Sequence, residues 1–410
     1  MSSPRPPPLW LLSLLPIAGA VFPFTTVALP FLLRQEGIPV DQIGRIVSEA
    51  LLVLPFSFIA APLTDMIFPR RIWVVVCNLI GAALLIVAIL LPRPSALSWL
   101  PFILALGNLA TSLAMTSAMG LMAAVLPDQV LGRGAGWFQM GNMGSVPLLG
   151  GICLLISAHL ARVPAALALG LISFLPAVSA FFVSEPPRPL RPSRSMYRLM
   201  GKECRALLCH RRAWLGMLLF AAPFGAGALG SLLSGLGADY HVRPALVQDI
   251  VGIPGGVVAA VIGAYIGGVC CDRLSRRPAY LGTGVLVALT ALVLALGPLT
   301  PATYVVGGLL YQAAAAMAFA AGLALALEIT EAAPHTAAFR MALFTACFNL
   351  PVSYVPAIDG WGSRWGVRGV AGTDAALAFA SVAVCGLIAL AFGPSGQAER
   401  GTCSETGFAS

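Results

Sequence analysis

Long uninterrupted apolar runs constrain the fold of this chain more than any other feature. The run from Ile72 to Leu91 contains 20 residues and no charged side chain. A helix needs roughly 20 apolar residues to cross the hydrocarbon layer of a membrane, and only helices or closed barrels satisfy their backbone polar groups in lipid. Barrel strands would alternate apolar and polar residues over about ten positions, a pattern that these runs lack. The runs therefore predict membrane-spanning helices.

Twelve runs meet the length requirement, six on each side of one long polar segment. They cover approximately residues 10–33, 43–63, 72–91, 99–126, 135–157, 164–183, 213–236, 246–270, 279–298, 303–327, 338–358 and 374–392. We expect an all-α membrane protein with an N-terminal six-helix half (1–184), a basic linker (185–212), a C-terminal six-helix half (213–393) and a tail (394–410). The linker either binds the anionic lipid surface as an amphipathic helix or is a basic tether.

Charge and cysteine content exclude several classes of protein. Charged residues make up 10% of the chain, against about 25% in a soluble domain. The net charge of +8 comes from short clusters between apolar runs, without the basic stripe that nucleic-acid binding requires. The nine cysteines form no CxxC or His-paired spacing, so neither a metal nor another cofactor is expected.

The distribution of basic residues predicts the orientation of the chain. Seventeen of the 24 Lys and Arg residues lie on the side that carries both termini. Because basic loops stay on the cytoplasmic side, we expect a multi-pass protein of the bacterial inner membrane with cytoplasmic termini. The first run is too long for a signal-peptide core, so we interpret it as a retained membrane helix.

One offset of 207 residues relates the two halves. It separates Asp65 from Asp272, and further pairs share it: Arg70 and Arg277, Pro94 and Pro301, Pro127 and Pro334, Arg133 and Arg340, Asn142 and Asn349. A shared offset across several loops indicates an internal repeat with matching topology. Transporters with parallel repeats work by rocking one half against the other.

The loops around the two aspartates resemble the signature loop of the major facilitator superfamily. The second copy has a small residue, an aspartate and basic residues at Gly268, Asp272, Arg273, Arg276 and Arg277. The first copy departs from the pattern at Ala61, Met66 and Phe68. The resemblance implies the twelve-helix major facilitator fold and transport of a small molecule by alternating access.

A narrower resemblance is to the muropeptide permease and acetyl-coenzyme A transporter branch. It rests on the segments from Ala28 to Arg34, Leu54 to Pro55, Ala61 to Asp65, Phe348 to Pro351 and Asp359 to Gly360. By analogy, this resemblance implies a muropeptide-like cargo or another amphiphilic anion.

The repeated loops suggest a latch that forms in one access state and breaks in the other. An aspartate can accept hydrogen bonds from a neighbouring helix start and pair with nearby arginines. The candidate latch residues are Asp65, Arg70, Arg71, Arg133, Gly268, Asp272, Arg273, Arg276, Arg277 and Arg340. The alternatives are that the aspartates only fix topology and that Arg133 and Arg340 snorkel to the membrane interface.

Ionisable residues inside membrane spans are functional candidates. Glu49, in the second run, and Asp249, in the eighth, are the candidate proton sites, because a carboxyl group removed from water takes up a proton more readily. For Glu49 the alternative is an ion pair with Arg45, which lies four residues away on the same helix face.

Polar side chains deep in the helices are candidates for a substrate cavity. They are Thr25, Thr26, Asn108, Gln139, Asn142, Tyr311, Gln312, Asn349 and Tyr354. Hydrogen bonds between helices would explain several of them equally well.

These patterns favour a secondary active or facilitative transporter, with or without proton coupling, that functions as a monomer. A non-transporting membrane receptor or assembly factor on the same scaffold is the alternative. An enzyme is not expected, because the sequence has no Walker loop, HExxH or GxSxG motif and its four histidines are scattered.

Overall fold

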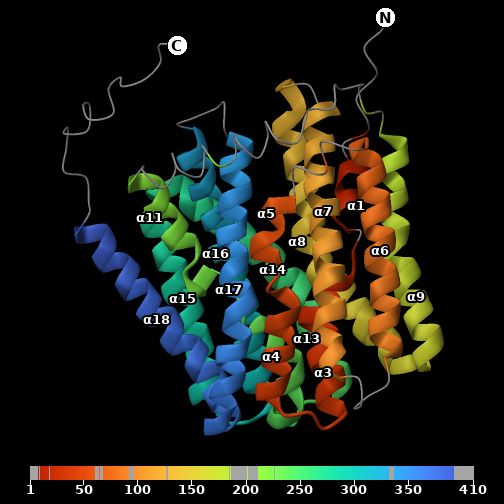
Figure 1. Cartoon of the computed structure of the whole chain (residues 1–410). Coiled ribbons are helices and arrows are strands. Elements are labelled where there is room, and N and C mark those ends of the chain that lie inside the picture. Colours follow the sequence, from red (N-terminus) through yellow and green to blue (C-terminus); the bar gives the residue numbers. More distant parts are fainter. Residues whose placement is uncertain are drawn as a thin grey trace, which may run out of the picture.

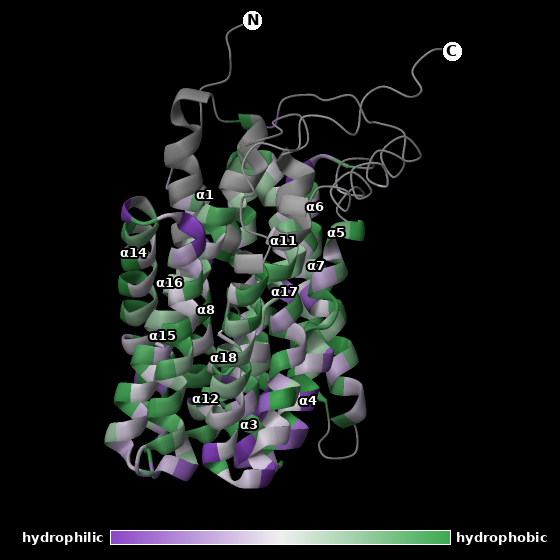
Figure 2. Cartoon of the chain, turned by 90° about the vertical axis from the view of Figure 1, so that its left-hand side faces the viewer, coloured by the Kyte–Doolittle hydropathy of each residue, from purple (hydrophilic) through white to green (hydrophobic). Residues whose placement is uncertain are grey.

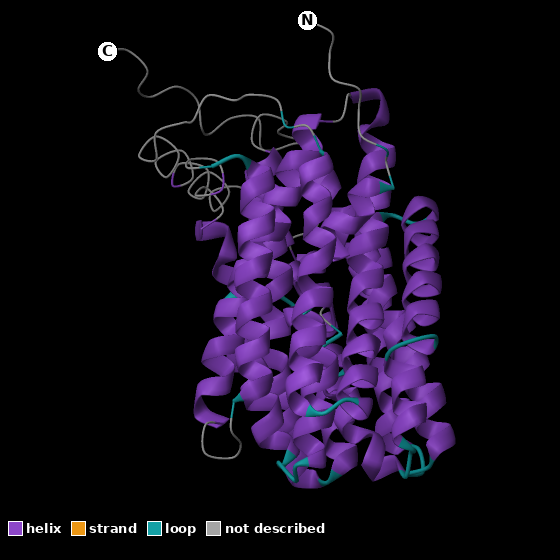
Figure 3. Cartoon of the chain, turned by 90° about the vertical axis from the view of Figure 1, so that its right-hand side faces the viewer, coloured by secondary structure: helices purple, strands orange, loops and turns teal. Residues whose placement is uncertain are grey.

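The computed structural model of the protein describes residues 8, 10–17, 19–60, 64, 68–91, 97–125, 128–183, 185, 201, 211–225, 227–331 and 337–391. Within these residues every regular element is a helix and none is a strand (Figure 3). By length and composition, eight of the described helices can each cross a membrane. The expected all-α membrane fold is therefore confirmed.

Each of the twelve predicted runs corresponds to one helical span. In the N-terminal half the spans are α1 (Leu11–Ile17) with α2 (Val21–Pro23), η1 (Phe24–Ala28) and α3 (Leu29–Gln35); α4 (Val40–Leu51) with η2 (Leu54–Phe56) and α5 (Ser57–Ala60); α6 (Arg70–Leu90); η4 (Leu97–Trp99) with α7 (Leu100–Val125); α8 (Asp128–His159); and α9 (Arg162–Phe174) with η5 (Leu175–Phe182).

The C-terminal half repeats this order of six spans. They are α11 (Arg211–Phe220) with η6 (Pro223–Gly225), α12 (Gly230–Leu236) and η7 (Gly237–Tyr240); α13 (Pro244–Val251) with α14 (Gly255–Arg273); α15 (Arg276–Leu296); α16 (Pro301–Glu331); α17 (Ala337–Gly362) with η9 (Ser363–Trp365); and α18 (Val367–Ala391).

The spans form one bundle with two distinct ends. We call the end where α6 and α15 begin, at Arg70 and Arg276, the basic end. The opposite end, where α4, α13 and α18 begin, is the distal end and lies at the bottom of Figure 1. Apolar residues cover the middle of the bundle (Figure 2). On α6 the large apolar side chains Val76, Leu79, Ile80 and Val87 are exposed, as expected for a surface that faces lipid.

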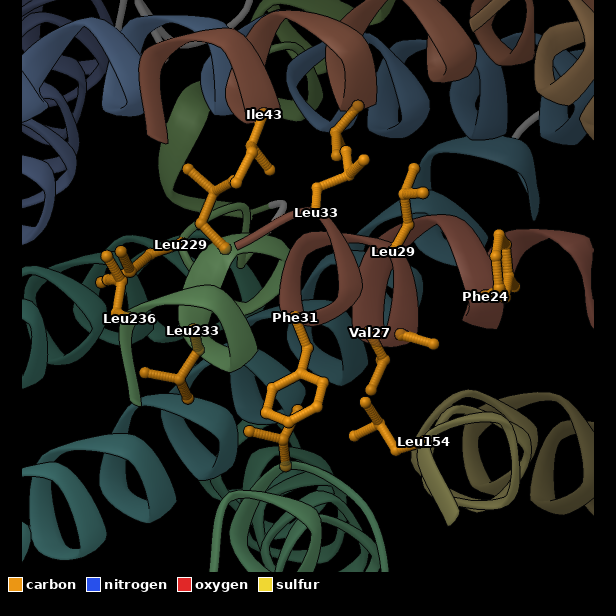
Figure 4. Close-up of a cluster of buried hydrophobic side chains, with 14 of the residues drawn as sticks. Phe24, Val27, Leu29, Phe31, Leu33, Ile43, Leu154, Leu229, Leu233 and Leu236 are labelled. Atoms are coloured by element: carbon orange, nitrogen blue, oxygen red, sulfur yellow. The ribbon is translucent and has the colours of Figure 1, made fainter. Parts of the chain in front are cut away.

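The first spans of the two halves pack against each other in the centre of the bundle. Phe24, Val27 and Leu33 of the first span lie in one buried cluster with Leu229 and Leu233 of the seventh (Figure 4). The hydroxyl of Ser234 donates a hydrogen bond to the carbonyl of Val27 at 2.6 Å. These two residues are separated by 207 positions, so the offset in the sequence also relates two residues that meet at the centre.

Glycines allow the halves to approach closely at two equivalent places. A Cβ atom on Gly44 of α4 would lie 2.2 Å from the carbonyl oxygen of Pro356 and 3.0 Å from Cα of Gly360, both on α17. A Cβ atom on Gly151 of α8 would lie 3.0 Å from Cα of Gly252, next to α13. The offset of 207 places the repeat counterpart of Gly44 at position 251 and that of Gly151 at position 358. The two contacts are therefore related by the internal repeat.

Candidate functional site

The first helix of each half is interrupted part-way through the bundle. Gly19, between α1 and α2, and Gly227, between η6 and α12, both have positive φ angles, of +97° and +58°. Glycine adopts such angles without the strain that a Cβ atom would add. Gly- or Pro-interrupted helices at corresponding positions of two repeats are the best sequence-level pointer to a transporter's binding site. We therefore take the two breaks as the centre of the candidate site.

The N-terminal break is closed by a serine of the sixth span. The N–H of Gly19 donates to the carbonyl of Ser173 at 3.0 Å, and the N–H of Ala20 donates to its hydroxyl at 2.8 Å. A Cβ atom on Gly19 would lie 2.9 Å from the side chain of Thr111. The freed backbone groups at this break are therefore satisfied by neutral partners in tightly packed surroundings.

A π-helical turn follows this break. Thr25 and Thr26 lie in it, both are buried, and their hydroxyls donate to carbonyls of their own span. The fully buried amide of Asn108 on α7 donates to the hydroxyl of Thr25 at 3.4 Å and to the carbonyl of Ala50 on α4 at 3.3 Å. The expected cavity residues Thr25 and Asn108 therefore meet, and Asn108 links three spans.

At the C-terminal break, the backbone bonds to an ionisable side chain instead. The N–H of Leu229 donates to the hydroxyl oxygen of Tyr311 on α16 at 3.2 Å. The hydroxyl of Tyr311 in turn donates to Oδ1 of Asp374 on α18 at 3.3 Å. The carboxyl group of Asp374 lies within hydrogen-bonding reach of the carboxyl group of Asp359 on α17. The backbone of this break is therefore connected to two buried acids.

The other expected cavity residues lie on the fifth, tenth and eleventh spans. Gln312 donates its amide to the carbonyl of Ile250 at 2.9 Å, and Tyr354 donates its hydroxyl to the carbonyl of Ala221 at 3.2 Å. Asn142 and Asn349 are half-buried. The side chain of Gln139 lies outside the described part of the chain.

The latch candidates that the structure describes contact helix ends. In the N-terminal half, the guanidinium of Arg70 donates to the carbonyl of Gly120 near the end of α7 at 2.6 Å. In the C-terminal half, that of Arg276 donates to the carbonyl of Ala324 on α16 at 3.4 Å. An arginine at the start of the third helix therefore contacts the fourth helix in both halves.

The remaining latch candidates are exposed, half-buried or not described. Arg273 and Arg277 are exposed, and Arg71 and Gly268 are half-buried. Asp65 and the side chains of Asp272, Arg133 and Arg340 lie outside the described residues.

Glu185 is a contact at the basic end that sequence reasoning missed. Its carboxylate accepts the backbone N–H of Arg70 at 3.1 Å and that of Arg71 at 3.3 Å. It therefore occupies the start of α6, where the helix dipole favours a negative charge. We expected this role for the loop aspartates.

The structure places both candidate proton sites on exposed surfaces. The carboxylate of Glu49 lies 3.9 Å from the guanidinium of Arg45, and the two side chains are 52% and 66% exposed. This is the ion pair that the sequence offered as the alternative. Asp249, on α13, is exposed as well. Neither carboxyl group is enclosed by the bundle, whereas Asp359 and Asp374 are 0% and 5% exposed.

Sequence reasoning missed the buried acids because it misplaced two helix boundaries. The eleventh and twelfth runs were expected to cover 338–358 and 374–392. The structure continues α17 to Gly362 and begins α18 at Val367. Asp359 therefore lies inside α17 rather than in a loop, and Asp374, the first residue of the expected twelfth run, lies about two turns into α18. The available signal was their position on either side of a short glycine-containing turn, where Gly366 has a φ of +82°.

One ion pair joins the two halves at the distal end. The guanidinium of Arg34, at the end of α3, lies 2.8 Å from the carboxylate of Asp239 in η7. Their side chains are 30% and 18% exposed. Sequence reasoning assigned no role to this pair, because the two residues belong to different halves and no spacing rule relates them.

Comparisons with solved structures support the fold. No family model and no curated protein sequence matches the chain. The solved structure of a mutant of the nucleoside transporter NupG is similar with a TM-score of 0.67 at 17% identity, covering 92% of this chain and 98% of that one. A bacterial homologue of the human lysosomal transporter Spinster, inward-facing and unoccupied, is similar with a TM-score of 0.63 at 15% identity, covering 93% and 94%.

The chain has the major facilitator fold. Both similar structures are transporters of that superfamily, so the resemblance carried by the signature loops is confirmed for the fold. In this major facilitator fold the first and the seventh helices are interrupted at corresponding places, and the eighth is interrupted between α13 and α14. The close glycine contacts join the second helix to the eleventh and the fifth to the eighth.

Proposed function

We propose that the chain is a secondary transporter that moves a small solute across a bacterial inner membrane by alternating access. The observation that carries this proposal is the pair of interrupted helices at corresponding places in the two halves of a major facilitator fold. In transporters of this kind, backbone groups of interrupted helices can contact a solute; here those groups bond to Ser173 and Tyr311. The basic end is the cytoplasmic side, in line with the charge distribution.

The contacts between the halves support an inward-facing state. The ion pair between Arg34 and Asp239 and the close approach of Gly44 to Gly360 both lie at the distal end. Contacts of this kind must break when that end opens, because packed interfaces switch between discrete arrangements rather than deform continuously.

The cargo we propose is a small polar solute taken up together with protons. The described side chains that hydrogen-bond at the two breaks are Ser173, Tyr311 and Asp374. Among the described side chains, no arginine donates a hydrogen bond there, so a cargo without net negative charge fits these groups better than an amphiphilic anion. We include muropeptides among the compounds to test because of the sequence resemblance, and nucleosides because of the structural similarity to the nucleoside transporter.

Uptake by the purified protein in liposomes tests the proposal. Nucleosides, muropeptides, sugars and acyl-coenzyme A are supplied with and without an imposed pH gradient. We expect one class to accumulate above the protein-free control. A bifunctional cross-link between cysteines that replace Arg34 and Asp239, in a background without other cysteines, should stop uptake. If no class enters faster than in protein-free liposomes, the non-transporting receptor becomes the better description.

A further inference from the structure

Two buried acids meet between α17 and α18 without a compensating charge. Asp359 is 0% exposed and Asp374 is 5% exposed, and their carboxyl groups are within hydrogen-bonding reach of each other. Of their four carboxyl oxygens, Oδ1 of Asp374 accepts a hydrogen bond from Tyr311. Among the described residues, no donor makes a hydrogen bond of ordinary geometry to the other three oxygens, although the hydroxyl of Thr373 lies close to Asp359.

The charged groups on the surrounding elements do not neutralise this pair. The ion pairs among the described residues are Arg34 with Asp239 and Arg45 with Glu49. The charged or titratable side chains on α4, on η7, in the α17–α18 turn and at the start of α18 are Asp41, Arg45, Glu49, Asp239, Tyr240, Arg364 and Arg368. Asp41, Arg364 and Arg368 are exposed. The facing parts of α12, α15 and α16 contribute Tyr311.

Two touching carboxylates cannot both stay ionised in such surroundings. Each charge loses its hydration on burial, and the like charge beside it adds repulsion, so one carboxyl group of the pair retains a proton. The protonated group can then donate to its neighbour, which supplies the donor that the unpartnered oxygens lack. We propose that Asp359 and Asp374 together bind the single proton that the transporter couples to its cargo, an inference that rests on the proposed transport function.

The position of the pair connects the proton to the closure of the distal end. Asp359 is adjacent to Gly360 and less than one turn from Pro356, the two residues that contact Gly44 of α4. When α4 separates from α17, the turn that carries Asp359 loses its cover. Water can then reach the pair, and a proton from that side binds to one carboxylate oxygen and forms the O–H bond. The neutral pair favours closure of the distal end. Once the basic end is open, the O–H bond breaks and the proton passes to water on that side.

The acid pair is also connected, through Tyr311, to the break in the seventh span. Tyr311 donates to Asp374 and accepts from the N–H of Leu229. A change of charge on the carboxyl pair therefore alters the hydrogen bonding of a backbone segment that a solute can contact. The proton and the cargo would therefore affect the same series of hydrogen bonds, from Leu229 through Tyr311 to Asp374.

The internal repeat does not carry these polar groups at the equivalent positions. The offset of 207 places the counterparts of Asp359, Asp374 and Tyr311 at Ile152, Leu167 and Leu104. All three are aliphatic, and Leu167 is 56% exposed, so the buried acid pair belongs to the C-terminal half alone. Buried uncompensated acids are costly to retain, so a functional role explains them better than a structural one.

A proton fits this site better than a metal cation. The described residues contain no group of three or more His, Cys, Asp or Glu side chains that could hold a metal ion. The hydroxyl of Thr373, next to Asp374, donates to carbonyls of its own helix at 2.9 and 2.8 Å. Carboxyl oxygens within hydrogen-bonding reach of each other are separated by a distance that one proton bridges.

Infrared spectroscopy of the full chain in detergent, without cargo, tests proton binding directly. The wild-type protein should show the C=O stretch of a protonated carboxylic acid at neutral pH. Asp359→Asn and Asp374→Asn should each remove it, because the introduced amide donates to the remaining carboxylate. Asp41→Asn, which changes an exposed acid on α4, should retain it. Unchanged elution on size exclusion shows that each variant is folded.

Three results would overturn the proton pair. The stretch could be missing in the wild type, it could persist in both asparagine variants, or sodium chloride but not choline chloride could abolish it, which would indicate a sodium site. In liposomes, both variants should lose accumulation driven by a pH gradient and keep exchange of cargo across the membrane. If both variants still accumulate cargo, the proposed proton pair is wrong, but the proposed transport function is unaffected. If the wild-type protein shows the C=O stretch but transports no cargo, the proposed transport function is wrong instead.

Discussion

Replacing Gly44 by alanine should open the distal end of the bundle. In the closed arrangement the added methyl group would lie 2.2 Å from the carbonyl oxygen of Pro356 and 3.0 Å from Cα of Gly360. Ordinary contact between such atoms begins near 3.4 Å. Because the first contact is with backbone, no side chain can rotate away. The helices α4 and α17 must therefore separate by about 1 Å before they reach favourable packing.

The size of the effect follows from the cost of overpacking. Inserting one carbon into a well-packed contact typically costs about 1–3 kcal/mol. The cost applies only to the state in which α4 and α17 touch. Since each 1.4 kcal/mol corresponds to a factor of ten, the ratio of distal-open to distal-closed molecules should rise by roughly 5- to 150-fold.

Distances between spin labels measure this shift. Labels on Gln35 at the end of α3 and Trp365 in η9 are both exposed and lie on opposite halves at the distal end. Gly44→Ala should move the distance distribution towards longer values. Gly372→Ala on α18 is the matched control, because its added Cβ atom would have nothing within 4 Å. A Gly44→Ala distribution identical to that of the wild type would refute the idea that this contact holds the distal end closed.

Three further substitutions probe the ion pairs and the helix start. Asp239→Asn removes a partly exposed ion pair with Arg34, which should cost about 1 kcal/mol and raise the distal-open fraction by about fivefold; exchanging the two charges should restore the wild-type distances. Glu185→Gln removes the negative charge at the start of α6 and should lower stability by about 0.5–1 kcal/mol, measured by thermal unfolding, without changing labelled distances at the distal end. Glu49→Gln breaks an exposed pair with Arg45, so we expect stability within about 1 kcal/mol of the wild type and unchanged accumulation; lost accumulation would return the proton site to Glu49.

The fold was predictable because it depends on properties that are local or periodic in the sequence. A run such as that from Ile72 to Leu91 must be helical in lipid whatever surrounds it, and α6 covers almost the same residues. The repeat offset of 207 carried long-range information as well. It predicted matching halves, and the structure brings Val27 and Ser234, which are separated by that offset, into one hydrogen bond.

The buried acids were not predictable in the same way. Hydropathy is a property of long windows, and single aspartates near Gly360, Gly366 and Gly372 mark an apparent end of the apolar run. Whether such a residue lies in a loop or inside a helix depends on its partners in space. For Asp374 the partner is Tyr311, 63 residues away on another helix. No periodicity relates the two positions.

The two interrupted helices differ in a way that assigns different tasks to the two halves. The N-terminal break is satisfied by Ser173, whose hydrogen bonds do not change with pH. The C-terminal break is satisfied by Tyr311, whose hydroxyl also contacts an acid that can gain or lose a proton. If the halves rock as rigid bodies, the first break keeps one geometry while the second has two. In such a duplicated fold, the N-terminal half would have no titratable group at its break. The C-terminal half would carry the titratable groups that couple a proton to a solute.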